Sequence, residues 1–263
     1  MPQTVILGTA RTPFGKMGGA FASKRAVELG GEAISAALER SGVEPGQVQQ
    51  VIYGQVLQAG QGQIPSRQAQ IEAGIPKEVP SETINKVCAS GMRSLGLADQ
   101  AIRAGDVEVA ATGGMESMSG APYMLPQARF GFRMGDAKAI DAMTHDGLTN
   151  PFTGNQMINE ASEVSNELEL TRADMDRWAA RSHQLAAKAT DEGRLADEIV
   201  SVTVKTRKSE DVVEADEAIR PDSTVETLAK LPAIGGDGAT HTAGNAPGVN
   251  DGAAAVEIGR AHV

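Results

Sequence analysis

The chain contains one cysteine, Cys88, within the stretch NKVCASGMRS. A lone cysteine is most often a small apolar core side chain. Cys88, however, is expected where an extended run ends and a helix begins, which would place its sulfur near unpaired amide N–H groups and the positive end of a helix dipole. Both favour the thiolate, the nucleophilic form of cysteine. Position alone leaves a structural and a catalytic cysteine equally open.

The residues after the cysteine are small: Ala89, Ser90 and Gly91. They would let a bulky acyl group approach the backbone closely. No metal site is expected, because His, Cys and carboxylate residues do not group at ligand spacing. The glycine-rich stretch near the end of the chain lacks a GK[ST] motif, so a nucleotide-phosphate loop is not expected either.

The strands and helices predicted around Cys88 must position it, and the sequence patterns that predict them alternate. Over residues 1–117, helical spacing that stops at Gly42, Gly74 and Gly105 separates four extended runs, TVILG, QVIYGQV, ETINKV and VEVAAT, of which TVILG is expected to be buried. This order predicts an α/β fold whose sheet is mostly parallel and covered on both faces.

The alternation breaks after residue 117, where a long irregular connection begins, and such connections are usually functional. A helix is expected to begin after Thr171, with Asp174 as its capping partner, and to end at Gly193. EIVSVTVK predicts a strand and residues 208–217 a solvated acidic loop. A last strand begins at AAAV and is expected to end at Glu257.

Composition excludes several classes of protein. The net charge is −10 and the 24 basic residues are scattered, which argues against a nucleic-acid partner. No stretch approaches the roughly 20 apolar residues of a membrane-spanning helix. One cysteine allows no internal disulfide and the sequence opens without a secretory signal pattern, so a cytoplasmic location is expected.

Four motifs occur in the order and at about the separations seen in thiolases: RTPFGKMGGAF, NKVCASGMRS, GGMESMS and TAGNAPGVNDGAAAV. From Met1 to about Val256 the chain resembles the acetyl-CoA acetyltransferase branch of that family. The resemblance implies the N-terminal half of a thiolase-like layered α/β sandwich with an inserted loop domain. Residues 1–117 would form the N-terminal α/β domain, residues 118–249 the loop domain that contacts CoA, and residues 250–263 the start of a C-terminal domain.

The resemblance makes Cys88 the nucleophile that takes an acyl group from acyl-CoA. Its backbone N–H would help to form an oxyanion hole, in which one donor lowers the barrier by roughly 3–4 kcal/mol. In synthesis the acyl-enzyme would condense with acetyl-CoA to give acetoacetyl-CoA. In degradation the reaction would run in reverse, and CoA would cleave a 3-ketoacyl-CoA. The partners implied are acetyl-CoA, CoA and 3-ketoacyl-CoA, with no separate cofactor, and a homodimer or homotetramer at full length.

The resemblance also implies a set of CoA contacts in the loop domain. These are the apolar walls Leu148 and Met157, the nucleotide contact Arg220, and the pocket positions Thr227, Ala243, Gln156 and Pro247. A lone Arg is more often a solvated charge, and a Met or Leu more often core. Gln156 stands where biosynthetic relatives have histidine, and Pro247 where many members have a serine. The acyl-CoA preference therefore stays open.

The catalytic histidine, second cysteine and asparagine of thiolases have no counterpart motifs in this sequence. The last seven residues, EIGRAHV, leave the family pattern, and their codons can be written as a common sequencing adapter. Residues 257–263 are therefore expected to be an artefactual tail on a C-terminally truncated chain, inactive as it stands, with an exposed apolar face. The alternatives are a ketosynthase, or a non-catalytic CoA- or lipid-binding protein on a partial thiolase fold.

Overall fold

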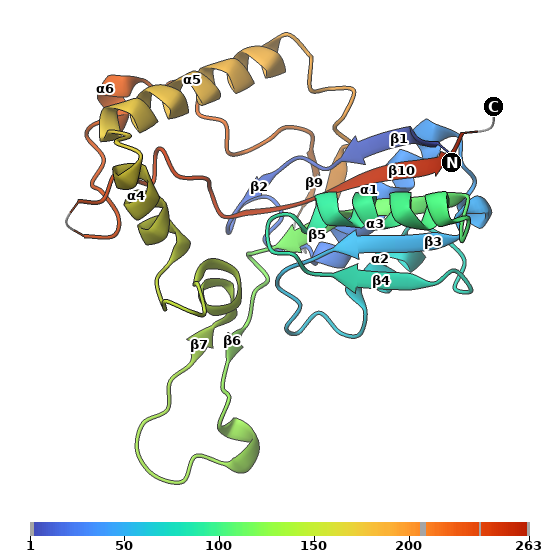
Figure 1. Ribbon diagram of the computed structural model, residues 1–263, viewed down its shortest axis with the longest axis horizontal. Helices are drawn as coiled ribbons and strands as arrows, with labels where there is room; N and C mark the ends of the chain where they lie inside the picture. Colours follow the sequence, from blue (N-terminus) through green and yellow to red (C-terminus); the bar gives the residue numbers. More distant parts are fainter. Residues whose placement is uncertain (1–2, 206–208, 237, 262–263) are drawn as a thin grey trace. The chain divides into compact units, whose positions relative to one another are not determined.

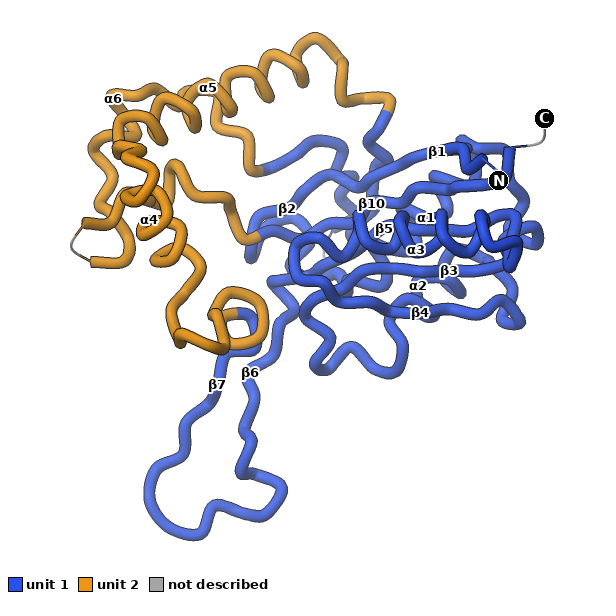
Figure 2. Tube along the Cα trace, viewed as in Figure 1, with its two compact units in different colours: residues 1–143, 198–217, 250–263 blue, residues 144–197, 218–249 orange. Residues whose placement is uncertain are grey.

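The structure, a computed structural model, describes residues 3–205, 209–236 and 238–261, which fall into two compact units (Figure 2). The first comprises Met1–Met143, Glu198–Glu217 and Asn250–Val263, and the second comprises Thr144–Asp197 and Ala218–Val249. The functional division into domains at residues 117 and 249 stays a prediction.

The first unit is built on one sheet (Figure 1). Its strand order is β1 (Thr4–Arg11), β10 (Asn250–Arg260), β5 (Val109–Ser117), β3 (Gln50–Gly54) and β4 (Ser81–Ile84), with β2 (Gly15–Lys16) also paired to β10. β3 is parallel to β4 and β5, whereas β10 is antiparallel to β1, β2 and β5.

The expectation of a mostly parallel sheet is therefore wrong, because the sheet is mixed. The cause lies in how the chain returns after the second unit. Asp251, near the start of β10, pairs with Ser117, the last residue of β5. A strand that enters the sheet where its neighbour leaves must run in the opposite direction.

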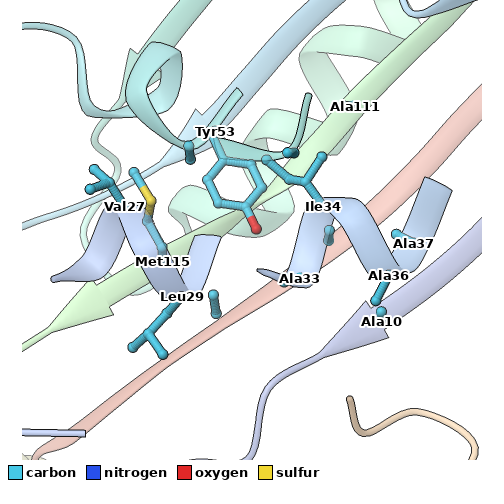
Figure 3. Packing of buried hydrophobic residues seen from close by; sticks show 14 of the residues in the cluster. Ala10, Val27, Leu29, Ala33, Ile34, Ala36, Ala37, Tyr53, Ala111 and Met115 are labelled. Atoms are coloured by element: carbon cyan, nitrogen blue, oxygen red, sulfur yellow. The ribbon is translucent and has the colours of Figure 1, made fainter. Parts of the chain in front are cut away.

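Helices cover both faces of this sheet, as expected. Side chains alternate across a strand, so Val51 and Tyr53 of β3 enter the core under α1 (Ala26–Ser41) and α2 (Pro65–Glu72). Ile52 points the other way, toward α3 (Ser90–Ala104). Figure 3 shows Tyr53 among small and branched side chains of the first core.

Left-handed glycines end the two long helices of this unit where the sequence predicts. Gly42 closes α1 with φ of 68° and Gly105 closes α3 with φ of 87°. Glycine adopts this conformation without the Cβ clash that other residues suffer. A 3₁₀ turn, η1 (Pro45–Gln47), follows α1.

Some apolar side chains of the first unit face solvent. Residues 4–8 form the predicted strand, but β1 lies at the sheet edge and Ile6 is 63% exposed, so the expectation that TVILG is buried is wrong. Between β6 (Tyr123–Met124) and β7 (Ile140–Asp141) a long hairpin with a 3₁₀ turn, η2 (Ala128–Phe130), leaves the sheet (Figure 1). Phe130 and Met134 on this hairpin are almost fully exposed.

The predicted acidic loop at residues 208–217 is wrong for its described part; residue 208 lies outside the described residues. Glu210–Val213 form β9, which pairs antiparallel with β8 (Val202–Lys205). Asp216 accepts hydrogen bonds from the Arg11 guanidinium at 2.8 and 2.9 Å. Glu217 accepts from the backbone N–H of Lys16 at 2.9 Å. The acidic residues therefore have partners, which a sequence run cannot show.

β10 continues through Glu257, so the expectation that this charge ends the strand is wrong. Glu257 pairs with Gly8 of β1 and with Ala111 of β5. Its side chain is fully buried on the α1 face of the sheet, the face that Ala255 also occupies. The artefactual origin of residues 257–263 stays a prediction.

The second unit is mainly helical. It contains most of the π-helical turn η3 (Met143–Leu148), and α4 (Met157–Glu167), α5 (Arg172–Asp191) and α6 (Val225–Leu228). The predicted capping box of α5 is present: the Thr171 hydroxyl accepts the Asp174 N–H at 3.2 Å. Among the described residues of both units, no helix is long and apolar enough to cross a membrane.

Candidate active site

Cys88 lies in the turn between β4 and α3, two residues before the first residue of the helix. Its thiol is free and exposed. No oxygen of the described residues accepts a hydrogen bond from its backbone N–H. The structure thus presents a nucleophile together with a donor that a bound carbonyl oxygen could use.

The turn before the cysteine has an unusual backbone conformation. Val87 has φ of 49°, in the left-handed region that a β-branched residue rarely adopts. Two side chains hold it there. The Asn85 Oδ1 accepts the Val87 N–H at 2.8 Å, and the Ser90 hydroxyl accepts the Lys86 N–H at 2.7 Å while it donates to the Val87 carbonyl at 2.6 Å. Their hydrogen bonds offset the strain and fix the direction in which Cys88 leaves the turn.

Glycines let the start of α3 approach the sheet. A Cβ on Gly54 of β3 would lie 2.7 Å from the carbonyl carbon and the Cβ of Ser90. Gly113 of β5 has φ of 138°, and a Cβ there would collide with the Ala254 carbonyl oxygen. A larger residue at Gly54 would push against the start of α3, whereas one at Gly113 would push against β10, so Gly54 determines how closely the cysteine turn lies on the sheet.

A cavity of about 360 Å³ opens beside Cys88. Its walls are mainly apolar or backbone, and its lining residues are Phe14, Gly54, Gln55, Val56, Leu57, Val87, Cys88, Ser90, Gly91, Gly114, Met115, Glu116, Met118, Gly252, Ala253 and Ala254. Such a lining suits the acyl and thioester end of a ligand, with few polar groups to orient it.

Cys88 and Glu116 are the titratable residues among those lining residues. The Glu116 carboxylate accepts the backbone N–H groups of Val56 at 2.9 Å and Leu57 at 3.1 Å. Burial raises the pKa of Glu116, although these two hydrogen bonds act in the opposite direction. No histidine is among the described residues that line the cavity. Among all described residues, no three His, Cys, Asp or Glu side chains are grouped to bind a metal ion.

The predicted CoA contacts all belong to the second unit. Leu148 ends η3, Gln156 immediately precedes α4, and Met157 begins that helix with its side chain 44% exposed. Gln156 is close to Leu148 in space, since it forms a β-bridge with Thr149. Leu148 therefore lies near Gln156 and Met157, at the two ends of a segment that folds back on itself.

Two more of the predicted contacts meet at a second place in this unit. The Arg220 guanidinium donates to the Ala243 carbonyl oxygen at 3.3 Å. The Arg220 backbone N–H donates to Nδ1 of His183, whose pKa is lowered by burial and by the charge of Arg220. Thr227 lies on α6, where its hydroxyl caps the helix with Thr224. Pro247 is exposed, in the loop that follows Ala243.

Sequence reasoning missed a buried network that holds the 242–247 segment. Asp176 of α5 is 1% exposed, accepts from the Arg172 guanidinium at 2.8 Å and accepts from the Asn245 amide at 2.9 Å. It also missed Glu116. A single charge inside the small and apolar stretch GGMESMS was the available signal for that residue.

Comparison with known proteins gives one consistent result. Residues 4–261 match the family model described as the thiolase N-terminal domain. The chain is 47% identical to an acetyl-CoA acetyltransferase of Cupriavidus necator over 98% of its own length, and 49% identical to one of Rhizobium meliloti over 97%. A solved acetyl-CoA acetyltransferase of Syntrophomonas wolfei superimposes over 99% of this chain with a TM-score of 0.96 and 40% identity. The chain spans 64–66% of the length of these proteins.

Proposed function

The chain belongs to the thiolase family, and from this premise we propose that it is the Cys88-bearing part of an acetyl-CoA acetyltransferase. The observation that carries the proposal is the exposed Cys88 thiol in a strained turn beside a mainly apolar cavity. The names of the similar proteins supply the substrate class.

In the proposed first step the Cys88 sulfur attacks the thioester carbonyl of an acyl-CoA. A bond forms between that carbon and the cysteine sulfur, the bond to the CoA sulfur breaks, and the CoA thiolate leaves and takes up the proton that the Cys88 thiol has lost. The Cys88 N–H would stabilise the negative charge on the carbonyl oxygen. The small residues around the turn give the acyl group room to approach.

In the second step the acyl group passes to a carbanion of acetyl-CoA, which gives acetoacetyl-CoA, or the reverse reaction consumes a 3-ketoacyl-CoA. Condensation requires a base that removes a proton from the α-carbon, and the reverse cleavage requires an acid that returns it. Glu116, the carboxyl group among the described lining residues, is already held by two backbone N–H groups. We therefore propose acyl transfer to Cys88 for this chain and expect the complete condensation only in a longer protein.

We propose that CoA binds to the second unit. We propose that Arg220 contacts the nucleotide end, since the residue is exposed and its guanidinium is oriented by the Ala243 carbonyl oxygen at 3.3 Å and by Nε2 of His183 at 3.4 Å. Leu148 and Met157 would contact pantetheine, with Thr227 and Ala243 as further contacts. The resemblance implies that Gln156 and Pro247 replace groups which relatives use, so the acyl preference is part of what the assay must measure.

Isotope exchange tests the proposal. The chain is incubated with acetyl-CoA and labelled CoA, and label entering the acetyl-CoA pool is followed for wild type and Cys88→Ala. Exchange that the variant abolishes supports acyl transfer. CoA binding of equal strength in both proteins with no exchange in either would contradict it and favour the non-catalytic CoA-binding alternative. Exchange with an acyl-carrier-protein thioester in place of acetyl-CoA would favour a ketosynthase.

We further propose that the protein acts in the cytoplasm and associates into dimers or tetramers when complete. The exposed Phe130 and Met134 on the β6–β7 hairpin support self-association, because large apolar groups exposed together often mark contact surfaces. Sedimentation of the wild type and of a Phe130→Ser/Met134→Ser variant tests it. An unchanged oligomeric state would exclude the hairpin as the contact.

A further inference from the structure

We propose that Glu116 is a positioning residue that fixes the direction of Cys88 through Val56 and Asn85. The catalytic importance of that direction rests on the proposed function. The structural coupling between Glu116 and the cysteine turn does not, and it can be measured without CoA.

The coupling follows a chain of hydrogen bonds within the first unit. The carboxylate of Glu116, on β5, accepts the Val56 N–H at 2.9 Å. The Val56 carbonyl then accepts the Asn85 amide Nδ2 at 3.3 Å. The Asn85 Oδ1 in turn accepts the N–H of Val87, the residue before Cys88, at 2.8 Å. Three hydrogen bonds, joined by the residues between them, thus connect Glu116 on β5 to the residue before the nucleophile.

A carboxylate is the group that this position needs. Glu116 receives N–H groups from two successive residues, Val56 and Leu57, one on each oxygen. An ionised carboxylate supplies both acceptors, whereas an amide supplies one acceptor and turns an NH₂ group toward the second N–H. Glutamine therefore keeps the size of the side chain but cannot hold both residues.

The conformation of Val87 makes the turn sensitive to this support. Its φ of 49° is unfavourable for a β-branched residue and persists only while surrounding bonds impose it. The support from Asn85 is accessible to solvent, since Asn85 is itself exposed. When Val56 is no longer held, Asn85 loses a fixed partner and Val87 can relax toward an extended conformation. Cys88 would then sample several directions instead of one.

The single cysteine allows a direct measurement of this mobility. A nitroxide spin label on Cys88 of the full chain reports motion of the turn through the width of its electron paramagnetic resonance spectrum. Glu116→Gln and Asn85→Ala are each expected to add a mobile, narrow component. The matched control is Glu78→Gln, which changes an exposed carboxylate away from the hydrogen-bond chain and is expected to leave the spectrum as in wild type.

The double variant shows whether Glu116 and Asn85 affect the mobility of the turn through one series of hydrogen bonds or independently of each other. If both residues act through the same path, Glu116→Gln in an Asn85→Ala background adds little further mobility. Circular dichroism confirms that each protein is folded. Asn85→Ala keeps the test valid if Glu116→Gln fails to fold, because Asn85 is exposed. A folded Glu116→Gln or Asn85→Ala protein with the wild-type spectrum would overturn the proposal, and so would fully additive mobility in the double variant.

A second measurement tests whether the conformation of the turn affects acyl transfer to Cys88. Acyl transfer from acetyl-CoA needs the sulfur at a defined position, and a misplacement of about 1 Å can slow a reaction about a hundredfold. We expect Glu116→Gln to lose at least about tenfold in acyl transfer while alkylation by the small reagent iodoacetamide changes about twofold or less. Equal losses in both reactions would contradict a positioning role. Absence of acyl transfer in wild type would refute the proposed function but leave the spin-label result standing.

Discussion

Replacing Glu257 with glutamine is expected to stabilise the first unit, and to do so more strongly as the pH rises. The Glu257 side chain is 0% exposed, and neither of its carboxyl oxygens has a hydrogen-bond partner among the described residues. Burial raises its pKa from the ordinary 4.5 to about 8. An unpaired carboxylate in such a place is costly, so the folded chain keeps it protonated at neutral pH.

The sign and size of the effect follow from linkage. The folded state binds this proton more tightly than the unfolded state does, so the stability is complete below pH 4.5 and is lost as the pH rises to about 8. At roughly 1.4 kcal/mol per pKa unit, the loss is about 3 kcal/mol at pH 7 and about 5 kcal/mol above pH 8. Glutamine resembles the protonated carboxyl in shape and does not ionise.

Urea unfolding followed by far-ultraviolet circular dichroism at pH 5, 7 and 8.5 measures the difference. Glu257→Gln should exceed wild type by about 1 kcal/mol or less at pH 5 and by about 5 kcal/mol at pH 8.5. Glu78→Gln, at an exposed carboxylate, should follow wild type throughout. A Glu257→Gln advantage that is equal at pH 5 and pH 8.5 would refute the reasoning, because the carboxyl would then not ionise within the folded state.

Three further substitutions test other parts of the structure. Thr171→Ala removes the α5 cap and should cost about 1 kcal/mol in unfolding followed by the fluorescence of the single tryptophan, which lies on α5. Asp176→Asn removes the buried carboxylate that pairs with the partly exposed Arg172 guanidinium and should cost about 1–3 kcal/mol by the same probe, with no change expected if the pair were solvated. Gly54→Ala brings a Cβ to 2.7 Å from Ser90 and should slow acyl transfer to Cys88 at least about tenfold; full activity would show that the turn tolerates the displacement.

The sequence was sufficient for elements whose signals are local. Helices α1, α3 and α5 have their ends where Gly42, Gly105 and the Thr171 capping box predict them, because each end depends on the conformation of a few neighbouring residues. The cysteine turn was also placed correctly between a strand and a helix. Its left-handed Val87 was not predicted, since valine gives no signal for that conformation.

Features that depend on distant residues were not predicted. The acidic segment at β9 has the composition of a solvated loop, and it pairs as a strand because β8 offers a matching edge. The partners of Asp216 and Glu217 come from residues about 200 positions earlier in the chain. β10 runs antiparallel to its neighbours because of where the chain re-enters the sheet. Glu116 received no role, since its importance lies in backbone groups that only the fold brings to it.

The origin of residues 257–263 is a separate question with a direct answer. Resequencing the gene through its 3′ end either reproduces the codons for EIGRAHV or replaces them. The prediction of an artefactual tail requires replacement, together with a continuation that carries a histidine motif and a second cysteine. An unchanged reading followed by a stop codon would contradict the prediction and favour the non-catalytic alternative.

The central claim is that Cys88 accepts an acyl group from CoA thioesters. Peptide mass mapping after incubation with acetyl-CoA tests it most directly, because the chain has one cysteine and a Cys88→Ser variant supplies the blank. The account predicts one acetyl group on the peptide that contains Cys88, removed by added CoA and absent from the variant. An unmodified Cys88 in a folded protein that still reacts with iodoacetamide would contradict the claim.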